Sequence, residues 1–134
     1  MSLSGKVILL TGGTGYVGSH CVKELPRQGY DVVMLDNLSQ SHREAVLTEH
    51  FVKADLLDQE ALSQTFDNYS IDAVMHFASL IRVGESVDNP HIYYRNNVLG
   101  TFNLLQTMQE HGVNRMIFSS SAALYGGPEI VPIP

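Results

Sequence analysis

Lys6-Val-Ile-Leu-Leu-Thr11-Gly12-Gly13-Thr14-Gly15-Tyr16-Val17-Gly18 passes from an apolar run, through a turn almost without side chains, into an amphipathic segment. This order predicts a strand, a glycine turn and a helix. The glycine spacing G-x-x-G-x-x-G is a variant of the dinucleotide-binding fingerprint. Its first glycine permits a tight turn, its second lets the backbone approach a pyrophosphate, and its third lets the helix pack close to the strand. The N-terminus of the helix favours a diphosphate without a basic side chain.

A second apolar run, Tyr30-Asp-Val-Val-Met-Leu-Asp36, ends in a carboxylate eighteen residues after Gly18. An acid at about this interval, at the end of the second strand, reaches the adenosine ribose hydroxyls of a bound dinucleotide. Asp36 would repel a 2′-phosphate, so we expect NAD rather than NADP. A plain glycine-rich turn is the alternative, and the position of Asp36 argues against it.

The composition fits one globular domain. The chain has 134 residues, of which 44% are hydrophobic and 16% charged, and its formal net charge is -6. With eight scattered Lys and Arg residues, nucleic acid is not an expected partner. No apolar run approaches the ~20 residues of a membrane span, so no membrane partner is expected either. Cys21 is the only cysteine, which excludes an internal disulfide; together with the lack of a signal peptide pattern, this predicts a cytoplasmic protein.

Strand and helix patterns alternate along the chain. Strands are expected at 7–10, 31–35, 50–54, 71–77 and 115–119, and helices at 16–28, from Asp58 to 66 and at 89–111. The fourth strand is expected to be buried on both faces. The last helix is expected to bury Val98, Phe102, Leu105 and Met108 on one face and to end at Gly112. The fold class is therefore α/β: a doubly wound, Rossmann-like parallel sheet in the order 3-2-1-4-5, incomplete at its C-terminal side.

Several short motifs resemble, in order, those of the extended short-chain dehydrogenases, and within that family the UDP-hexose 4-epimerases. They are Thr11 to Gly18, Asp36-Asn-Leu-Ser39, Asp55-Leu56, His76-Phe-Ala-Ser79, Val83-Gly-Glu-Ser-Val87, Tyr93-Tyr-Arg-Asn-Asn-Val98 with Gly100-Thr101, and Phe118-Ser-Ser-Ser-Ala122 with Tyr125-Gly126. The glycine motif is shared by the whole family. The His-Phe-Ala, Val-Gly-Glu-Ser and Tyr-Tyr-x-Asn-Asn motifs are narrower and favour the epimerases over the sugar-nucleotide dehydratases.

The resemblance implies the roles of individual residues. Catalysis would involve Ser121, which matches a hydroxyl that hydrogen-bonds the 4-OH of the sugar. The cofactor NAD would be bound by Gly12, Gly15, Tyr16, Val17 and Gly18 at the pyrophosphate, Asp36 and Asn37 at the ribose, Asp55 and Leu56 at the adenine, and Phe77, Ala78 and Asn96 further along. Bland alternatives stay open: Leu56 and Phe77 as core, Asn96 as an amide that satisfies backbone groups, and Ser121 as a turn hydroxyl. His76 is expected to be a packed or hydrogen-bonded residue rather than an acid or base, and no metal site is expected.

The resemblance also implies an activity for the complete protein. NAD would take a hydride from C4 of a UDP-hexose, giving a 4-keto sugar, and return it to the other face. A homodimer is implied as well. The chain departs from the family in two places: Ile81 and Arg82 stand where a lysine often contacts the cofactor, and the family's Tyr-x-x-x-Lys is missing. We therefore expect residues 1–134 to form the N-terminal part of an NAD-binding domain, inactive by itself and without the substrate-binding domain.

Two other functions remain open at this point. One is another extended dehydrogenase, such as a sugar-nucleotide dehydratase or reductase. The other is a non-catalytic NAD-binding module, in which the missing tyrosine and lysine are the native state.

Overall fold

Five parallel strands form the central sheet of the computed structural model, which describes residues 5–127 and 129–132. The strands are β1 (Lys6–Thr11), β2 (Tyr30–Asp36), β3 (Phe51–Lys53), β4 (Ile71–His76) and β5 (Met116–Phe118). Their order, β3-β2-β1-β4-β5, confirms the predicted topology. The direction of strand addition reverses between β1 and β4, so the carboxyl ends of these two strands mark the crevice where ligands bind in such sheets.

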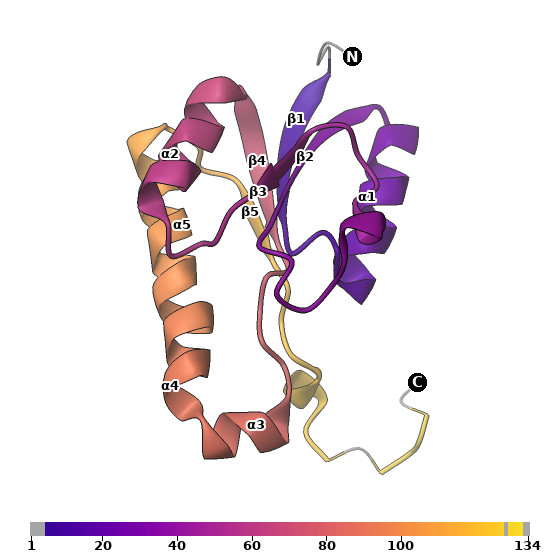
Figure 1. Ribbon diagram of the computed structural model, residues 1–134. Coiled ribbons are helices and arrows are strands. Elements are labelled where there is room, and N and C mark those ends of the chain that lie inside the picture. The colour runs from indigo at the N-terminus through magenta and orange to yellow at the C-terminus, as the bar shows by residue number, and fades with distance from the viewer. Residues whose placement is uncertain (1–4, 128, 133–134) are drawn as a thin grey trace.

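Helices cover both faces of the sheet (Figure 1). α1 (Tyr16–Arg27) lies on one side, and α2 (Gln59–Asn68) and α5 (Gly100–Glu110) lie together on the other. α4 (Pro90–Tyr93) and a π-helical turn, η2 (Tyr94–Leu99), precede α5 directly, so the backbone is helical without a break from α4 to the end of α5. The remaining elements are α3 (Val83–Asp88), η1 (Arg43–Ala45) and η3 (Ala122–Tyr125). Within the described ranges, no helix is long and apolar enough to cross a membrane.

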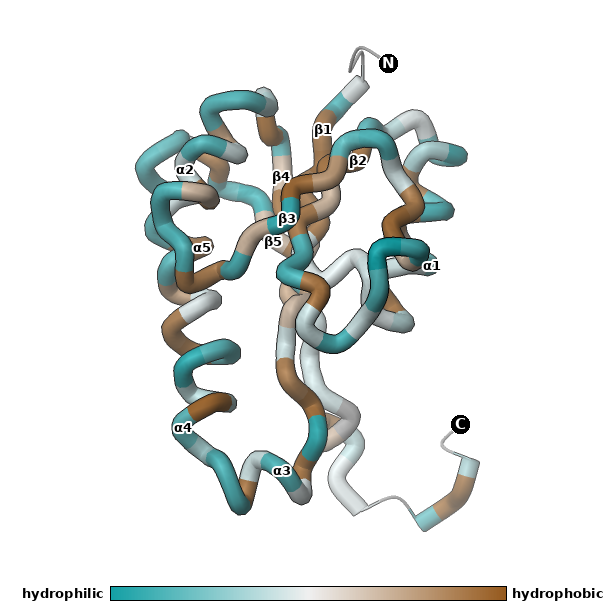
Figure 2. Tube along the Cα trace, viewed as in Figure 1, coloured by the Kyte–Doolittle hydropathy of each residue, from teal (hydrophilic) through white to brown (hydrophobic). Residues whose placement is uncertain are grey.

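The core has two layers because side chains alternate along the strands. Val33 and Leu35 of β2 pack with α2 and α5, whereas Val32 and Met34 pack with the Val22 side of α1. Figure 2 shows hydrophobic residues concentrated in the central strands. The apolar runs of β1 and β2 are thus buried on both faces.

Several predicted helix ends are confirmed. Asp58 is the N-cap of α2, and its carboxylate accepts a hydrogen bond of 3.0 Å from the Ala61 N–H. α1 ends one residue before the predicted Gln28, with Pro26 inside its last turn. Gly112 follows α5 with φ +71°, as a glycine beyond a helix end does.

The predicted apolar face of the last helix is wrong. Val98, Phe102 and Leu105 are 59%, 61% and 46% exposed, and only Met108 of that set is buried. The buried side of α5 instead includes Gly100, where an added Cβ would lie 3.1 Å from the Cβ of Leu56. Close packing at a glycine and buried polar side chains decide the orientation of this helix, and hydropathy alone does not.

Two further expectations need correction. β4 is not buried on both faces along its whole length, because Asp72 is exposed and its carboxylate accepts the Val7 N–H at 2.8 Å. Neither α3 nor the π-helical turn was predicted. A six-residue helix carries little periodic signal, and a π turn has no distinctive residue pattern.

Candidate functional site

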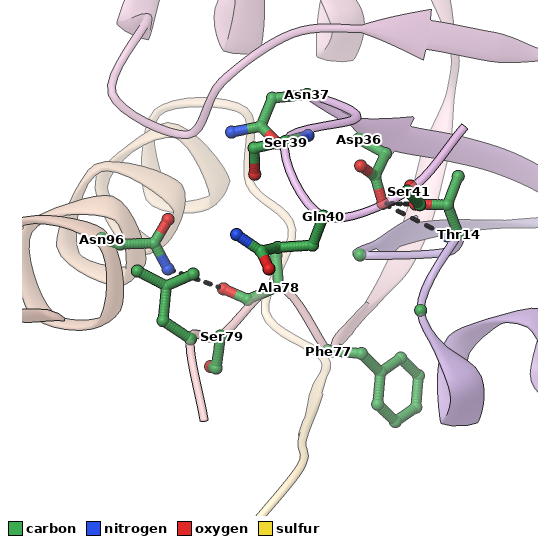
Figure 3. A pocket seen from close by; sticks show the side chains of 13 residues that line it. Thr14, Asp36, Asn37, Ser39, Gln40, Ser41, Phe77, Ala78, Ser79 and Asn96 are labelled. Carbon is green, nitrogen blue, oxygen red and sulfur yellow. Dashed lines mark hydrogen bonds between the residues drawn. The ribbon is translucent and has the colours of Figure 1, made fainter. Parts of the chain in front are cut away.

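A pocket opens at the carboxyl ends of β1 and β4, where the strand order reverses (Figure 3). Four segments surround it: the glycine turn after β1, the polar loop after β2, the segment after β4 and the π-helical turn η2. Its lining residues are Gly12, Thr14, Gly15, Asp36, Asn37, Ser39, Gln40, Ser41, Phe77, Ala78, Ser79, Leu80 and Asn96. The structure therefore brings seven of the predicted site residues to one pocket: Gly12, Gly15, Asp36, Asn37, Phe77, Ala78 and Asn96.

The first glycine of the motif is required by the protein itself. Gly12 has φ +73°, and an added Cβ would lie 2.6 Å from the backbone nitrogen of Ala78 and the carbonyl carbon of Phe77. The third glycine, Gly18, is buried under the Gly12 carbonyl oxygen, which a Cβ at Gly18 would strike. These two glycines let β1, α1 and the segment after β4 meet closely.

The second glycine, Gly15, is different. Its φ of -71° and ψ of 171° suit any residue, and an added Cβ would approach the protein no closer than 3.4 Å, at the Gly12 oxygen. Neither backbone conformation nor packing demands glycine at this exposed position. Its missing side chain leaves space in the pocket at the first turn of α1, which is the place for a group that the backbone must approach closely.

Asp36 lies at the end of β2 beside the glycine turn. Its Oδ2 accepts hydrogen bonds from the Thr14 N–H at 3.2 Å and the Thr14 hydroxyl at 2.6 Å, and its Oδ1 accepts the Leu38 N–H at 2.8 Å. Figure 3 shows Thr14, Ser41 and the Asp36 carboxylate side by side. An ionised carboxylate accepts about four hydrogen bonds, so these three leave room for a ligand hydroxyl.

Asp55 and Leu56 follow β3 and do not line the pocket. Asp55 is tied to it through Asn37, whose side-chain amide donates to the Asp55 carboxylate at 2.8 Å. Leu56 is 5% exposed and belongs to the core. The alternative interpretation of Leu56, as a core residue, is therefore correct for its side chain.

The segment after β4, residues 77–80, forms one wall of the pocket, here called the far wall. The Phe77 ring is turned away from the other labelled side chains (Figure 3) and packs on the α1 side of the core, as the core alternative expects. The Asn96 amide donates to the Ala78 carbonyl oxygen at 3.4 Å and to Asn97 Oδ1 at 2.8 Å. Asn96 therefore lines the pocket and also satisfies a backbone group, so both proposed roles are compatible with its position.

His76 is buried at the end of β4 and held by two threonines. Thr101 donates its hydroxyl hydrogen to the Asn97 carbonyl oxygen at 2.6 Å, so we assign the proton of His76 to Nε2, which lies 3.0 Å from Thr101 Oγ1. Nδ1 then accepts the Thr11 hydroxyl at 2.6 Å. Burial lowers the pKa of His76 to about 4. The ring is neutral with both nitrogens engaged, which confirms the expected hydrogen-bonded residue.

The other predicted residues lie outside the pocket. Tyr16 and Val17, in the first turn of α1, are 83% and 52% exposed. Ser121 caps η3, where its hydroxyl oxygen accepts the Ala123 N–H at 3.2 Å, so the turn-hydroxyl role is the one that the structure displays. Ile81 is 84% exposed and does not line the pocket.

Sequence reasoning missed several lining residues, namely Thr14, Ser39, Gln40, Ser41, Ser79 and Leu80. Thr14 stands inside the glycine motif, and the others lie in the same two loops as the predicted residues Asn37 and Ala78, so their positions were a usable signal. The sequence also assigned no role to Gly13, although a Cβ there would strike the Met34 side chain. Asn97 and Thr101 stand in the motifs Tyr93 to Val98 and Gly100-Thr101, but nothing in the sequence indicated that they support the far wall.

Most of the chain is similar to known proteins. Residues 8–134 match the model of the NAD dependent epimerase/dehydratase family. UDP-glucose 4-epimerase of Bacillus subtilis (strain 168) is 51% identical over an alignment of 136 positions. The alignment covers 94% of this chain and 40% of that protein. The solved UDP-glucose 4-epimerase from Brucella ovis in complex with NAD is 47% identical with a TM-score of 0.87, covering 96% of this chain and 40% of that one. The enzyme from Bifidobacterium longum in complex with NAD+ and UDP is 39% identical with a TM-score of 0.87, covering 96% and 41%.

Proposed function

Because this chain belongs to the NAD dependent epimerase/dehydratase family, we propose that its pocket binds NAD and that the protein is a UDP-glucose 4-epimerase. The chain spans 20% to 40% of the length of the curated relatives it matches, so the activity is proposed for the whole protein. In this proposal residues 1–134 form the N-terminal part of the cofactor-binding domain, and contacts to the sugar nucleotide come largely from elsewhere in the protein.

The observation that carries this proposal is the space at Gly15. A glycine that neither φ nor packing requires, at the first turn of a twelve-residue helix and inside a pocket at the strand-order reversal, is explained by a ligand. The unpaired N–H groups and dipole of the helix start favour an anionic ligand there. A pyrophosphate fits both the space and the charge.

The remaining residues fit the rest of NAD. Asp36 retains hydrogen-bond capacity for a ribose hydroxyl. Asn37 follows Asp36 in the chain and is hydrogen-bonded to Asp55. Asp55 and the backbone of Leu56 are therefore proposed to contact the adenine, next to the ribose. Tyr16, Val17 and Gly18 would contribute through the backbone of the helix start. Phe77, Ala78 and Asn96 would border the middle of the cofactor.

When bound, NAD supplies a hydride acceptor and donor for C4 of the sugar. The chain's own residues bind and orient it. His76 does not serve as the general base, because its pKa is about 4 and both of its ring nitrogens are hydrogen-bonded. We propose Ser121 as a contact of the reacting 4-OH: its oxygen accepts the Ala123 N–H, and a hydroxyl that accepts one hydrogen bond can still donate its own hydrogen to the substrate.

Calorimetric titration with NAD and NADP tests the proposed cofactor. The Asp36 carboxylate repels a 2′-phosphate, so NAD should bind at least about tenfold more tightly, which corresponds to ~1.4 kcal/mol. Asp36→Asn keeps the shape but removes the charge, and it should narrow this gap. Equal affinities of the unaltered protein for the two cofactors would contradict the assignment of Asp36 to the ribose.

We also propose a homodimer and a cytoplasmic location. The homodimer is supported by the uncovered apolar side chains along η2 and α5: Val98, Leu99, Phe102 and Leu105 are 59%, 48%, 61% and 46% exposed. Apolar patches of this kind mark interaction surfaces. Sedimentation equilibrium of the protein with and without Phe102→Ser tests whether this face joins two copies.

A further inference from the structure

The π-helical turn η2 places two consecutive asparagines against the segment that follows β4. π turns are rare and are often found at functional sites. Asn96 contacts the Ala78 carbonyl oxygen, and Asn97 contacts Leu80. The wider turn lets neighbouring side chains of one helix reach the same stretch of backbone.

Asn97 holds both polar backbone groups of Leu80. Its Oδ1 accepts the Leu80 N–H at 2.9 Å, and its Nδ2 donates to the Leu80 carbonyl oxygen at 2.9 Å. Ala78, Ser79 and Leu80 line the pocket, whereas Asn97 does not. The shape of this wall therefore depends on a side chain that lies behind it.

Asn97 is itself held from the sheet by a chain of hydrogen bonds. Its carbonyl oxygen accepts the Thr101 hydroxyl at 2.6 Å, and Thr101 Oγ1 accepts the His76 Nε2–H at 3.0 Å. His76 Nδ1 accepts the Thr11 hydroxyl at 2.6 Å. Each group in the chain donates toward the next, from the end of β1 to the π turn, and Thr11 and His76 are 0% and 1% exposed.

We infer that the hydrogen-bond chain Thr11–His76–Thr101–Asn97 fixes the π turn and thereby positions the Ala78–Leu80 wall of the cofactor pocket. Thr101 and Asn97 are positioning residues, since they act through the backbone of Leu80. Thr101 holds the central place, because its one hydroxyl both accepts from His76 and donates to Asn97. The relevance of this device to NAD rests on the proposed function.

The α5 helix offers a matched control. Thr107 is buried, and its hydroxyl donates to the Asn103 carbonyl oxygen at 2.9 Å, the same four-residue backward bond that Thr101 makes to Asn97. Thr107 lies outside the chain from Thr11 to Asn97. Thr101→Val and Thr107→Val remove the same kind of bond from one helix, and only Thr101→Val breaks the chain. Thr101→Ser keeps the hydroxyl.

The first readout is amide hydrogen exchange of Leu80 in the protein without cofactor. Exchange at this N–H should become at least about tenfold faster in Thr101→Val and stay within about twofold of the parent in Thr101→Ser and Thr107→Val. Asn97→Ala, which removes the partner of Leu80 directly, should match Thr101→Val and serves if the valine variant does not fold. Unchanged Leu80 exchange in a folded Thr101→Val protein, or in Asn97→Ala, would overturn the inference.

The second readout is the dissociation constant for NAD. It should rise about tenfold in Thr101→Val and in Asn97→Ala, and stay near the parent value in the two control variants. Faster Leu80 exchange with unaltered NAD affinity would overturn the positioning role. A parent protein that does not bind NAD would refute the proposed function instead, and the exchange ratio would still decide whether the hydrogen-bond chain holds the wall.

Discussion

The two walls of the pocket are built in different ways. On the β1–α1 side, glycines let backbone segments meet, and Gly12 leaves no space for a Cβ beside Phe77 and Ala78. On the β4 side, the wall is held by side-chain amides and hydroxyls of Asn97, Thr101 and the buried His76. The first wall is therefore sensitive to added volume, and the second to the loss of a polar group or to protonation.

Gly12→Ala should have the largest effect on stability. The left-handed φ costs a non-glycine residue about 1 to 2 kcal/mol, and overlap with the backbone of Phe77 and Ala78 adds about 1 to 3 kcal/mol. Gly29→Ala is the control, because Gly29 has φ +83° but nothing within 4 Å of an added Cβ. In urea unfolding we expect a loss of about 3 kcal/mol or more for Gly12→Ala and about 1 kcal/mol for Gly29→Ala. Equal losses would show that the close approach is unimportant.

The β4 wall should weaken in acid. Burial lowers the pKa of His76 from 6.5 to about 4, so the unfolded chain takes up a proton at pH values where the folded protein does not. The stabilisation by neutral His76 is present above about pH 6.5 and is lost as the pH falls toward 4. Between pH 7 and pH 5 this one group should cost about 2 kcal/mol of unfolding free energy.

Urea unfolding at pH 7 and pH 5 measures this effect. His76→Gln should lose about 2 kcal/mol less than the parent over that step, since the titrating group is gone. His42→Gln, at an exposed position, should retain the parent's pH dependence. If His76→Gln also retains it, the ring is not held neutral and the β4 wall is not acid-sensitive through His76.

Thr14→Val should have the smallest effect of the three. It removes the hydroxyl that donates to the Asp36 carboxylate at 2.6 Å, at a half-buried position, and should cost about 1 kcal/mol. Thr14→Ser keeps the hydroxyl and should cost less. Equal thermal unfolding temperatures for Thr14→Val and Thr14→Ser would show that the hydrogen bond from Thr14 to Asp36 does not stabilise the β1–α1 wall.

The difference between the walls also explains what the sequence could predict. The strand order, the caps at Asp58 and Gly112, and the meeting of Gly12 with Asp36 followed from apolar runs, turn residues and the direction of parallel strands. These features depend on local pattern and on topology, which one sequence contains.

The β4 side was harder to predict because its contacts join residues far apart in the chain through single polar groups. His76 was expected to be hydrogen-bonded, but its link through Thr101 to Asn97 depends on a π turn that leaves no pattern. The orientation of α5 was mispredicted for a related reason. Gly100 and buried polar groups such as Asn103 face the core, while Phe102 remains exposed.

The central claim is that Gly15 leaves space for the pyrophosphate of NAD, and an NAD titration of the parent and of Gly15→Asp tests it most directly. Aspartate is a favoured N-cap residue, so the variant should unfold at the same temperature as the parent or higher. Its carboxylate would occupy the space and repel the phosphates. We predict that the parent binds NAD and that Gly15→Asp binds it at least about 100-fold more weakly, a difference of about 2.7 kcal/mol. A folded Gly15→Asp protein with the parent's NAD affinity would contradict the account.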